Sequence, residues 1–197
     1  MSDLLARANL VDFVCSHKQQ SLGVMEKISP DEVGRLIRLL AQARQTKRQI
    51  FICGNGGSAA TASHFANDLG KGASYGRSQR FRVYALTDST PWITALANDV
   101  GYSQIFVEQL KNHAEAGDLL IAFSGSGNSP NVVEAIKWGN DNGVTTVGIT
   151  GRPGGELGRL ARYPFFIESS HMGHIEEGHF LIQHMVSYYF MDGENQS

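Results

Sequence analysis

The amino-acid sequence predicts an α/β fold built on a five-stranded parallel sheet with helices on both faces. From residue 49 onward, short apolar runs alternate with stretches of helical periodicity. Each apolar run ends near glycine, serine or threonine, and such alternation is typical of a parallel sheet covered by helices. The chain has 197 residues, 42% hydrophobic and 18% charged, as in an ordinary globular domain. We therefore expect a single domain over residues 1–197, with residues 1–47 as an N-terminal helical extension.

Five apolar runs are the expected strands. They cover residues 49–53, 82–86, 119–123, 145–149 and 163–167. The helices expected between them cover residues 59–69, 91–97, 102–114, 131–142 and 156–160, and a last long helix covers 174–190. No linker or low-complexity stretch interrupts this pattern.

Two further helices are expected before the first strand. Residues 4–22 carry apolar side chains at helical spacing, and a second helix is expected from Ser29 to about residue 46. Ser29 can cap that helix, Pro30 suits its first position, and Asp31 and Glu32 suit the helix dipole. Neither helix belongs to a strand–helix–strand unit. They form either an added packing or oligomer element, or a lid over the same core.

The composition argues against several classes of protein. The formal net charge of −2 offers no electrostatic case for binding nucleic acid or an anionic membrane surface. No apolar run approaches the roughly 18 residues of a membrane span, and the N-terminus lacks a signal-peptide pattern. Cys15 and Cys53 lie in apolar contexts without a spaced motif, and we expect both to be reduced, buried and structural. These features predict a soluble, cytoplasmic protein.

A glycine-rich turn follows the first expected strand. Residues 54–58 have almost no side-chain bulk, and Ser58 can cap the helix that follows. Unpaired N–H groups and the helix dipole favour an anion at such a helix N-terminus. His64 and Asp68 lie one turn apart on the same face of that helix. The segment therefore offers a phosphate cradle and two possible metal or acid–base ligands.

A second loop, Ser124-Gly-Ser-Gly-Asn-Ser129, connects the third expected strand to a helix that starts near Pro130. Its three hydroxyls and its free N–H groups can bind a phosphate from several sides. Neither loop contains the lysine of a nucleotide-binding P-loop, so a monophosphate suits the site better than a nucleoside triphosphate. The alternative is that both are tight turns that need glycine for backbone reasons.

The last expected helix carries a second group of polar residues. Glu176 and His184 are about two turns apart on one face, and with His64 and Asp68 they can complete a Zn²⁺-type site. The alternative is a polar helix face with surface carboxylates and a satisfied histidine. Spacing alone favours this alternative, because other candidates are equally available on this segment: His171, Glu177 and His179.

These motifs resemble, in order and spacing, those of the sugar isomerase (SIS) domain family. The matching segments are Cys53-Gly-Asn-Gly-Gly-Ser58, His64-Phe-Ala, Asn98-Asp99, Ser124-Gly-Ser-Gly-Asn-Ser129, Thr150-Gly151 and Ile175-Glu-Glu-x-His179. The resemblance covers nearly the whole chain and is strongest to the branch that isomerises sedoheptulose 7-phosphate in bacterial heptose synthesis. It implies a flavodoxin-like three-layer subunit, a homotetramer with active sites between subunits, and zinc-dependent isomerisation.

Carried over position by position, the resemblance implies roles for the matching residues. Substrate contacts are expected from Asn55, Gly56, Gly57, Ser58, Asp68, Asn98, Asp99 and Glu176. The phosphate is expected at Ser124, Gly125, Ser126 and Ser129. One Zn²⁺ is expected at His64, Asp68, Glu176 and His184, and such ligands also accept Mn²⁺ or Fe²⁺.

Three positions depart from the family pattern. The family usually has glutamate in place of Asp68, glutamine in place of Glu176, and an acidic residue in place of Gly173. Aspartate keeps a carboxylate on a shorter side chain. Glutamate adds a negative charge, which binds a divalent cation more tightly and alters the pKa of its neighbours.

Two functions from different classes fit these features. The first is an aldose–ketose isomerase of a phosphorylated sugar, with Asp68 as the base and His184 as the acid. The second is a non-catalytic SIS module that binds a sugar phosphate or, as in tetrameric relatives, a replication initiator. Those relatives lack the metal histidine of the final helix. Because this chain has both His64 and His184, the sequence favours the enzyme.

Overall fold

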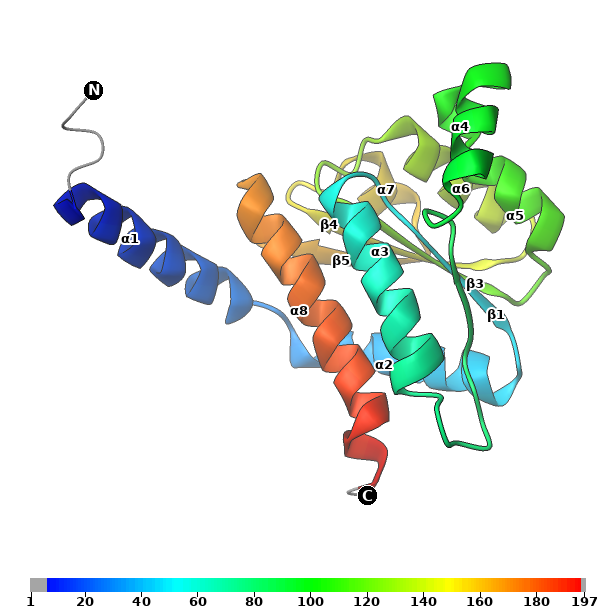
Figure 1. The fold of residues 1–197 in the computed structure, drawn as a ribbon, viewed down its shortest axis with the longest axis horizontal. Coiled ribbons are helices and arrows are strands. Elements are labelled where there is room, and N and C mark those ends of the chain that lie inside the picture. Colours follow the sequence, from blue (N-terminus) through cyan, green and yellow to red (C-terminus); the bar gives the residue numbers. More distant parts are fainter. Residues whose placement is uncertain (1–6, 196–197) are drawn as a thin grey trace.

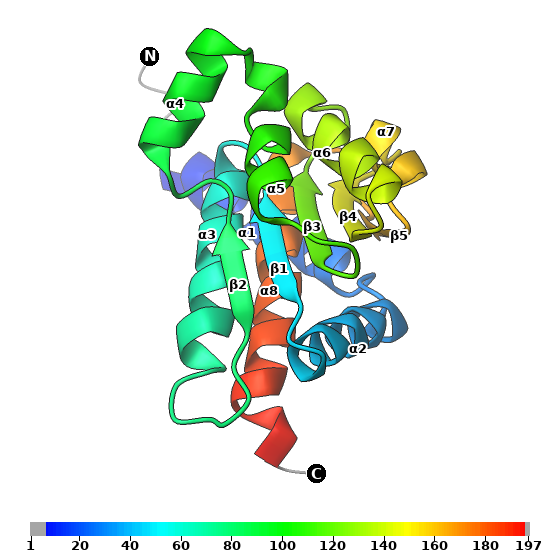
Figure 2. The same cartoon turned by 90° about the vertical axis from the view of Figure 1, so that its right-hand side faces the viewer.

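A parallel sheet of five strands forms the centre of the computed structural model, which describes residues 7–195. The strands are β1 (Gln49–Cys53), β2 (Arg82–Ala85), β3 (Leu119–Ser124), β4 (Thr145–Gly151) and β5 (Tyr163–Ile167). Their order in the sheet is β2-β1-β3-β4-β5, which is the flavodoxin-like order (Figure 2). The predicted fold class is therefore confirmed.

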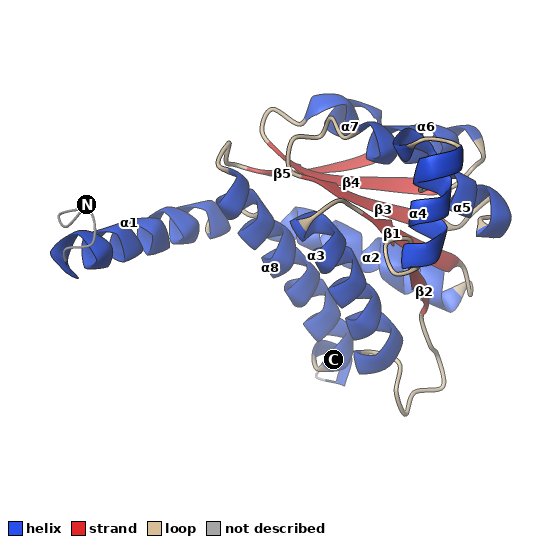
Figure 3. Cartoon of the chain, turned by 45° about the horizontal axis from the view of Figure 1, so that its top comes forward, coloured by secondary structure: helices blue, strands red, loops and turns tan. Residues whose placement is uncertain are grey.

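Helices cover both faces of the sheet (Figures 1 and 3). One face packs against α2 (Pro30–Gln45), α3 (Gly57–Asn67) and α8 (Met172–Met191). The other face packs against α5 (Val107–His113), α6 (Pro130–Asp141) and α7 (Gly155–Leu160). Alternation along each strand explains the two layers, because Ile50 and Ile52 of β1 face the first group and Phe51 and Cys53 face the second.

The first helix, α1 (Arg7–Met25), projects away from this sandwich and contacts α8 (Figure 1). Its predicted start at residues 4–6 lies outside the described residues. Several large apolar side chains of α1 are exposed, with Phe13 at 69% exposure. Cys15 is also exposed, so the expectation that it is buried is wrong. Spacing along α1 predicted a helix, but it did not reveal that this part of the helix leaves the core.

The remaining elements are short or lie at the edges. Helix α4 (Thr90–Asp99) buries no residue, and η3 (Tyr102–Gln104) is a short turn before α5. Helix α3 passes directly into a π-helical turn, η2 (Asp68–Gly72), and the described chain ends with η4 (Gly193–Asn195). Among residues 7–195, no helix has the length and apolar character needed to cross a membrane.

The start of α2 confirms one local prediction. The Ser29 hydroxyl accepts a hydrogen bond from the backbone N–H of Glu32 at 3.3 Å, and Pro30 occupies the first turn. The expected helix over residues 102–114 is instead divided between η3 and α5, because the chain turns between them.

Candidate active site

The two glycine–serine loops meet at the carboxyl ends of β1 and β3. β1 and β3 are neighbours at the point where the strand order reverses, since β2 lies on one side of β1 and β3 to β5 on the other, and ligands bind at such points in open α/β folds. The loops and α8 enclose a cavity of about 290 Å³. Its lining includes Asn55, Gly56, Gly57, Ser58, Ser124, Gly125, Ser126, Ser129 and Glu176. The structure thus brings together most of the residues predicted to contact substrate.

The helix after the first loop begins earlier than predicted. Gly56, with φ at +54°, is the N-cap of α3, and no side chain caps the helix. Ser58 lies buried inside the first turn, so the expectation that Ser58 caps this helix is wrong. The positive φ of Gly56 allows the sharp turn that starts α3 at Gly57, one residue before Ser58. The first turn of α3 consequently has no side-chain cap, and its residues Gly57 and Ser58 line the cavity, where their N–H groups can meet an anion.

The second loop is held by its own hydroxyls. Ser124 Oγ lies 3.2 Å from Ser129 Oγ and accepts a hydrogen bond from Gly127 N at 3.2 Å. Ser129 is the N-cap of α6, and its side chain makes no capping hydrogen bond. Ser126 is exposed at the mouth of the cavity. These hydroxyls and the N-terminus of α6 are suited to hold one phosphate group.

Asn131 joins the two loops, and sequence analysis did not identify it. Its side-chain amide donates to Asn55 Oδ1 at 2.8 Å, and the amide of Asn55 donates to Asn131 Oδ1 at 2.9 Å. The Tyr102 hydroxyl also donates to Asn55 Oδ1, at 3.0 Å. Asn131 is fully buried, and a buried amide requires such partners. Nothing in the sequence around Pro130 indicated that burial.

His64, Asp68 and His184 form a second cluster beside the cavity. One ligand atom from each lies within 4.8 Å of the others. His64 Nε2 is 3.2 Å from Asp68 Oδ2, and the rings of His64 and His184 have centroids 5.1 Å apart. The ring of Phe180 packs edge-on against both histidines. These three predicted ligands therefore converge, because α3 and α8 pack side by side.

The donor set and its surroundings fit a divalent metal. Two imidazoles and a carboxylate are typical ligands of Zn²⁺ and similar ions. Asp68 Oδ2 is buried and accepts no hydrogen bond, although His64 lies close to it. A buried carboxylate oxygen left in this state is costly, and a cation would satisfy it.

Glu176, the predicted fourth ligand, is not part of this cluster. A Cβ atom added to Gly57 would lie 2.5 Å from Glu176 Oε1, so the carboxylate rests against the first turn of α3. Glu176 and Gly57 line both the phosphate cavity and a second cavity of about 490 Å³. His184 and Phe180 also line the second cavity. Glu176 thus stands between the phosphate cradle and the histidine cluster.

Asn98 and Asp99 lie at the exposed end of α4. They hydrogen-bond to each other at 2.7 Å, and neither is among the residues that line the two cavities. Within a single chain, the structure does not bring Asn98 and Asp99 to the candidate active site. Their role in substrate binding stays a prediction.

The three other ligand candidates on the last helix segment lie in two different places. His179 is fully buried beside Phe123 with both ring nitrogens unpaired, and burial lowers the pKa of its imidazole to about 4. Glu177 and His171 instead lie toward α1. Partial burial opposes ionisation of Glu177, but contacts with Ser21, His17 and His174 outweigh it and hold the pKa of that carboxyl at about 2.

Cys53, at the end of β1, is fully buried, and its pKa is raised. Complete burial raises the pKa of its thiol to about 12, so it stays protonated and unreactive. The prediction that Cys53 is reduced and buried is confirmed.

Comparison with known proteins identifies the class to which this site belongs. The family model of the SIS domain matches residues 16–151. The phosphoheptose isomerase of Aneurinibacillus thermoaerophilus is 36% identical over 182 residues, which cover 89% of this chain and 90% of that protein. The phosphoheptose isomerase of Nitratidesulfovibrio vulgaris is 35% identical over 90% of this chain and 86% of that protein.

Solved structures agree with this assignment. The phosphoheptose isomerase of Neisseria gonorrhoeae has a TM-score of 0.85 at 30% identity, covering 92% of this chain and 98% of that one. The enzyme of Francisella tularensis has a TM-score of 0.84 at 25% identity, covering 95% and 98%. The chain belongs to the SIS domain family. Within it, the chain is an isomerase of the phosphoheptose isomerase group, which confirms the predicted resemblance.

Proposed function

We propose that the chain is a metal-dependent aldose–ketose isomerase that interconverts sedoheptulose 7-phosphate and a heptose 7-phosphate in bacterial heptose biosynthesis. The observation that carries this proposal is the position of the phosphate cradle beside the cluster of His64, Asp68 and His184, with Gly57 and Glu176 between them. A sugar phosphate can place its phosphate in the cradle and extend its carbonyl end toward the cluster. A cytoplasmic location is part of the proposal, because sugar phosphates are intracellular metabolites.

The cradle supplies binding energy far from the reacting carbons. Ser124, Ser126 and Ser129 offer hydroxyls, and the first turn of α3 offers N–H groups. Interactions at the phosphate orient the other end of the sugar, and such remote binding is a common source of rate enhancement. Asn55, held by Asn131 and Tyr102, lies where the two loops meet and can fix the adjacent hydroxyls.

His64, Asp68 and His184 would hold the metal, with Glu176 as the fourth predicted ligand. When bound, a divalent cation would supply positive charge that stabilises negative charge developing on the sugar oxygens during the reaction. Zn²⁺ suits this nitrogen and oxygen donor set, and Mn²⁺ or Fe²⁺ would also be accepted.

Two proton transfers complete the isomerisation. Asp68 accepts the proton from C1 of the ketose, which gives a cis-enediol, and the proton is then returned to C2. His184 moves the second proton between the two oxygens, so that the C2 carbonyl becomes a hydroxyl and the C1 hydroxyl becomes a carbonyl. Asp68 Oδ2 is buried and accepts no hydrogen bond, which supports its assignment as the base.

A homotetramer with active sites between subunits is also proposed. Helix α1 and the segment that leads from α4 into η3 expose apolar side chains that a subunit contact would cover: Leu10, Val11, Phe13, Val14, Leu22, Val100 and Tyr102. Asn98 and Asp99 lie beside the α4 part of this surface, so a subunit contact there provides a route by which they reach a substrate.

A panel of phosphorylated ketoses with five to seven carbons tests the proposal. We expect the metal-loaded protein to form an aldose from sedoheptulose 7-phosphate, and to lose this activity when a chelator removes the metal. Turnover of none of the sugars would contradict the isomerase. Absence of bound metal even when Zn²⁺ is supplied would favour the non-catalytic adaptor.

A further inference from the structure

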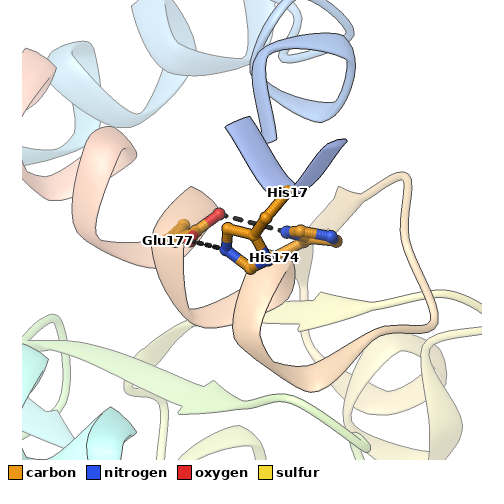
Figure 4. Close-up of side chains that lie close together, drawn as sticks. All are labelled: His17, His174 and Glu177. Atoms are coloured by element: carbon orange, nitrogen blue, oxygen red, sulfur yellow. Dashed lines mark hydrogen bonds and ion pairs between the residues drawn. The ribbon is translucent and has the colours of Figure 1, made fainter. Parts of the chain in front are cut away.

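A second group of ligand-type side chains joins α1 to α8, outside the candidate active site. His17 comes from α1, and His174 and Glu177 come from the first turns of α8 (Figure 4). His17 Nε2 lies 3.0 Å from Glu177 Oε1, and His174 Nδ1 lies 3.2 Å from Glu177 Oε2. The rings of His17 and His174 have centroids 4.6 Å apart. One ligand atom from each residue lies within 4.8 Å of the others.

The distances suit a single ion as well as they suit hydrogen bonds. Nitrogen and oxygen ligands lie about 2.0–2.2 Å from Zn²⁺ in a tetrahedral site, so ligand atoms are then roughly 3.3–3.6 Å from one another. The nitrogen-to-oxygen distances of 3.0 and 3.2 Å are close to that value. The two distances run to different oxygens of the Glu177 carboxylate, so each imidazole already faces one of its oxygens.

Polar groups surround the cluster and can hold its ligands in a fixed orientation, as in metal sites. His174 is 4% exposed, and its ring contacts two further polar groups: Ser21 Oγ lies 3.2 Å from Nδ1, and Gln20 Oε1 lies 3.4 Å from Nε2. The ring of His171 lies against His174 with centroids 4.4 Å apart. The cluster therefore has nearby groups that can orient the ligands.

We propose that His17, His174 and Glu177 bind a second divalent transition-metal ion of the Zn²⁺ type, which fastens α1 to α8. Two imidazoles and one carboxylate form a ligand set that Zn²⁺, Co²⁺ and Ni²⁺ accept, with a water or a neighbouring side chain at a fourth position. The site is separate from His64, Asp68 and His184, and it does not depend on the proposed isomerase activity.

The position of the site gives it a structural consequence. Helix α1 exposes much of its apolar surface; it packs against α8, and Val24 near its end reaches the core. Glu177 also lines the 490 Å³ cavity, together with Met25 at the end of α1 and His184 of the candidate active site. A metal at His17 thus fixes one wall of that cavity.

The hydrogen-bonded arrangement offers an alternative in which Glu177 simply bridges two histidines. In that case the cluster would hold α1 in place without metal. The two possibilities predict different amounts of bound metal per subunit and a different effect of metal on α1, so the test measures both quantities.

The test removes the candidate active-site ligands first. In the double variant His64→Ala, His184→Ala, metal retained after dialysis against Zn²⁺ and then metal-free buffer must be bound elsewhere. We expect about one Zn²⁺ per subunit by atomic emission, and loss of that ion when His17→Ala is added. His17 is about one-third exposed on a surface helix, so this change is tolerated by the fold. His113→Ala, an exposed histidine outside both clusters, is the matched control and should leave the ion bound.

Limited proteolysis supplies the second measurement. Zn²⁺ should slow cleavage within α1 at least several-fold in the His64→Ala, His184→Ala protein, and it should have no effect once His17→Ala is present. Equal Zn²⁺ content with and without His17, or no retained Zn²⁺ in the double variant, would overturn the proposal. A Co²⁺-loaded double variant whose visible spectrum is unchanged by His17→Ala would overturn it as well.

Discussion

The side-chain amides of Asn55 and Asn131 donate hydrogen bonds to each other, at 2.9 and 2.8 Å, and so join the loop after β1 to the first turn of α6. Each loop contributes part of the phosphate cavity. The pair therefore sets the distance between the two halves of the cradle.

Replacing Asn131 by alanine should weaken both folding and substrate binding. The change leaves Asn55 without its buried partner, which costs about 1–3 kcal/mol of unfolding free energy. We expect KM for the sugar phosphate to rise several-fold with a smaller change in kcat, because the cradle acts on binding and orientation. Urea denaturation and steady-state kinetics measure the two effects. Asn112→Ala, on the exposed side of α5, is the control and should change neither.

Removing the charge of Glu176 should strengthen anion binding. Its carboxylate rests against the N-terminal turn of α3, where it occupies the position that favours a phosphate. We expect Glu176→Gln to bind inorganic phosphate about threefold to tenfold more tightly in metal-free protein, since removal of a nearby like charge in a partly exposed site is worth about 1 kcal/mol. Isothermal titration calorimetry measures this affinity. Glu134→Gln, on the surface of α6, is the control and should leave phosphate affinity unchanged. Unchanged or weaker phosphate binding by Glu176→Gln would refute the role given to Glu176.

His179 should make the protein less stable in mild acid. Burial lowers the pKa of its imidazole from 6.5 to about 4 in the folded chain, so the unfolded chain binds a proton first as the pH falls. The free energy of unfolding that depends on the neutral His179 imidazole is fully present above about pH 6.5, and it is lost progressively as the pH falls toward 4. Between pH 7 and pH 5 this loss is about 2 kcal/mol.

Urea denaturation at several pH values tests the assignment of that acid sensitivity to His179. In His179→Leu, which has a similar volume and no titrating group, the loss between pH 7 and pH 5 should shrink by about that amount. His113→Ala should retain the full loss, because that side chain is exposed. An identical pH dependence in wild type and His179→Leu would show that other groups cause it.

The fold was largely predictable because its determinants are local. Alternating apolar runs and helical periodicity specify β1 to β5 and the helices between them, and the observed strand order is that of the flavodoxin-like fold that the family resemblance implies. The exposure of Cys15 was not predictable in the same way. Helical spacing shows that a segment is a helix, whereas the point at which α1 leaves the core depends on contacts between distant segments.

The candidate site was predictable only in part for the same reason. The glycine–serine loops and the pair of His64 and Asp68 are encoded by short motifs, so their chemistry is visible in the sequence. The partner of Asn55, the direction of Glu176 and the meeting of His17 with Glu177 depend on packing across more than 70 residues of chain. No periodicity predicts such pairs.

Turnover of sedoheptulose 7-phosphate by Zn²⁺-loaded wild type and by His184→Ala tests the central proposal most directly. We predict that the wild-type protein forms the heptose 7-phosphate and that His184→Ala lowers kcat/KM by at least about 100-fold, the effect expected when an acid–base group is lost. His113→Ala should retain wild-type activity. Full turnover by the His184→Ala protein, or none by the metal-loaded wild type, would contradict the proposed isomerase.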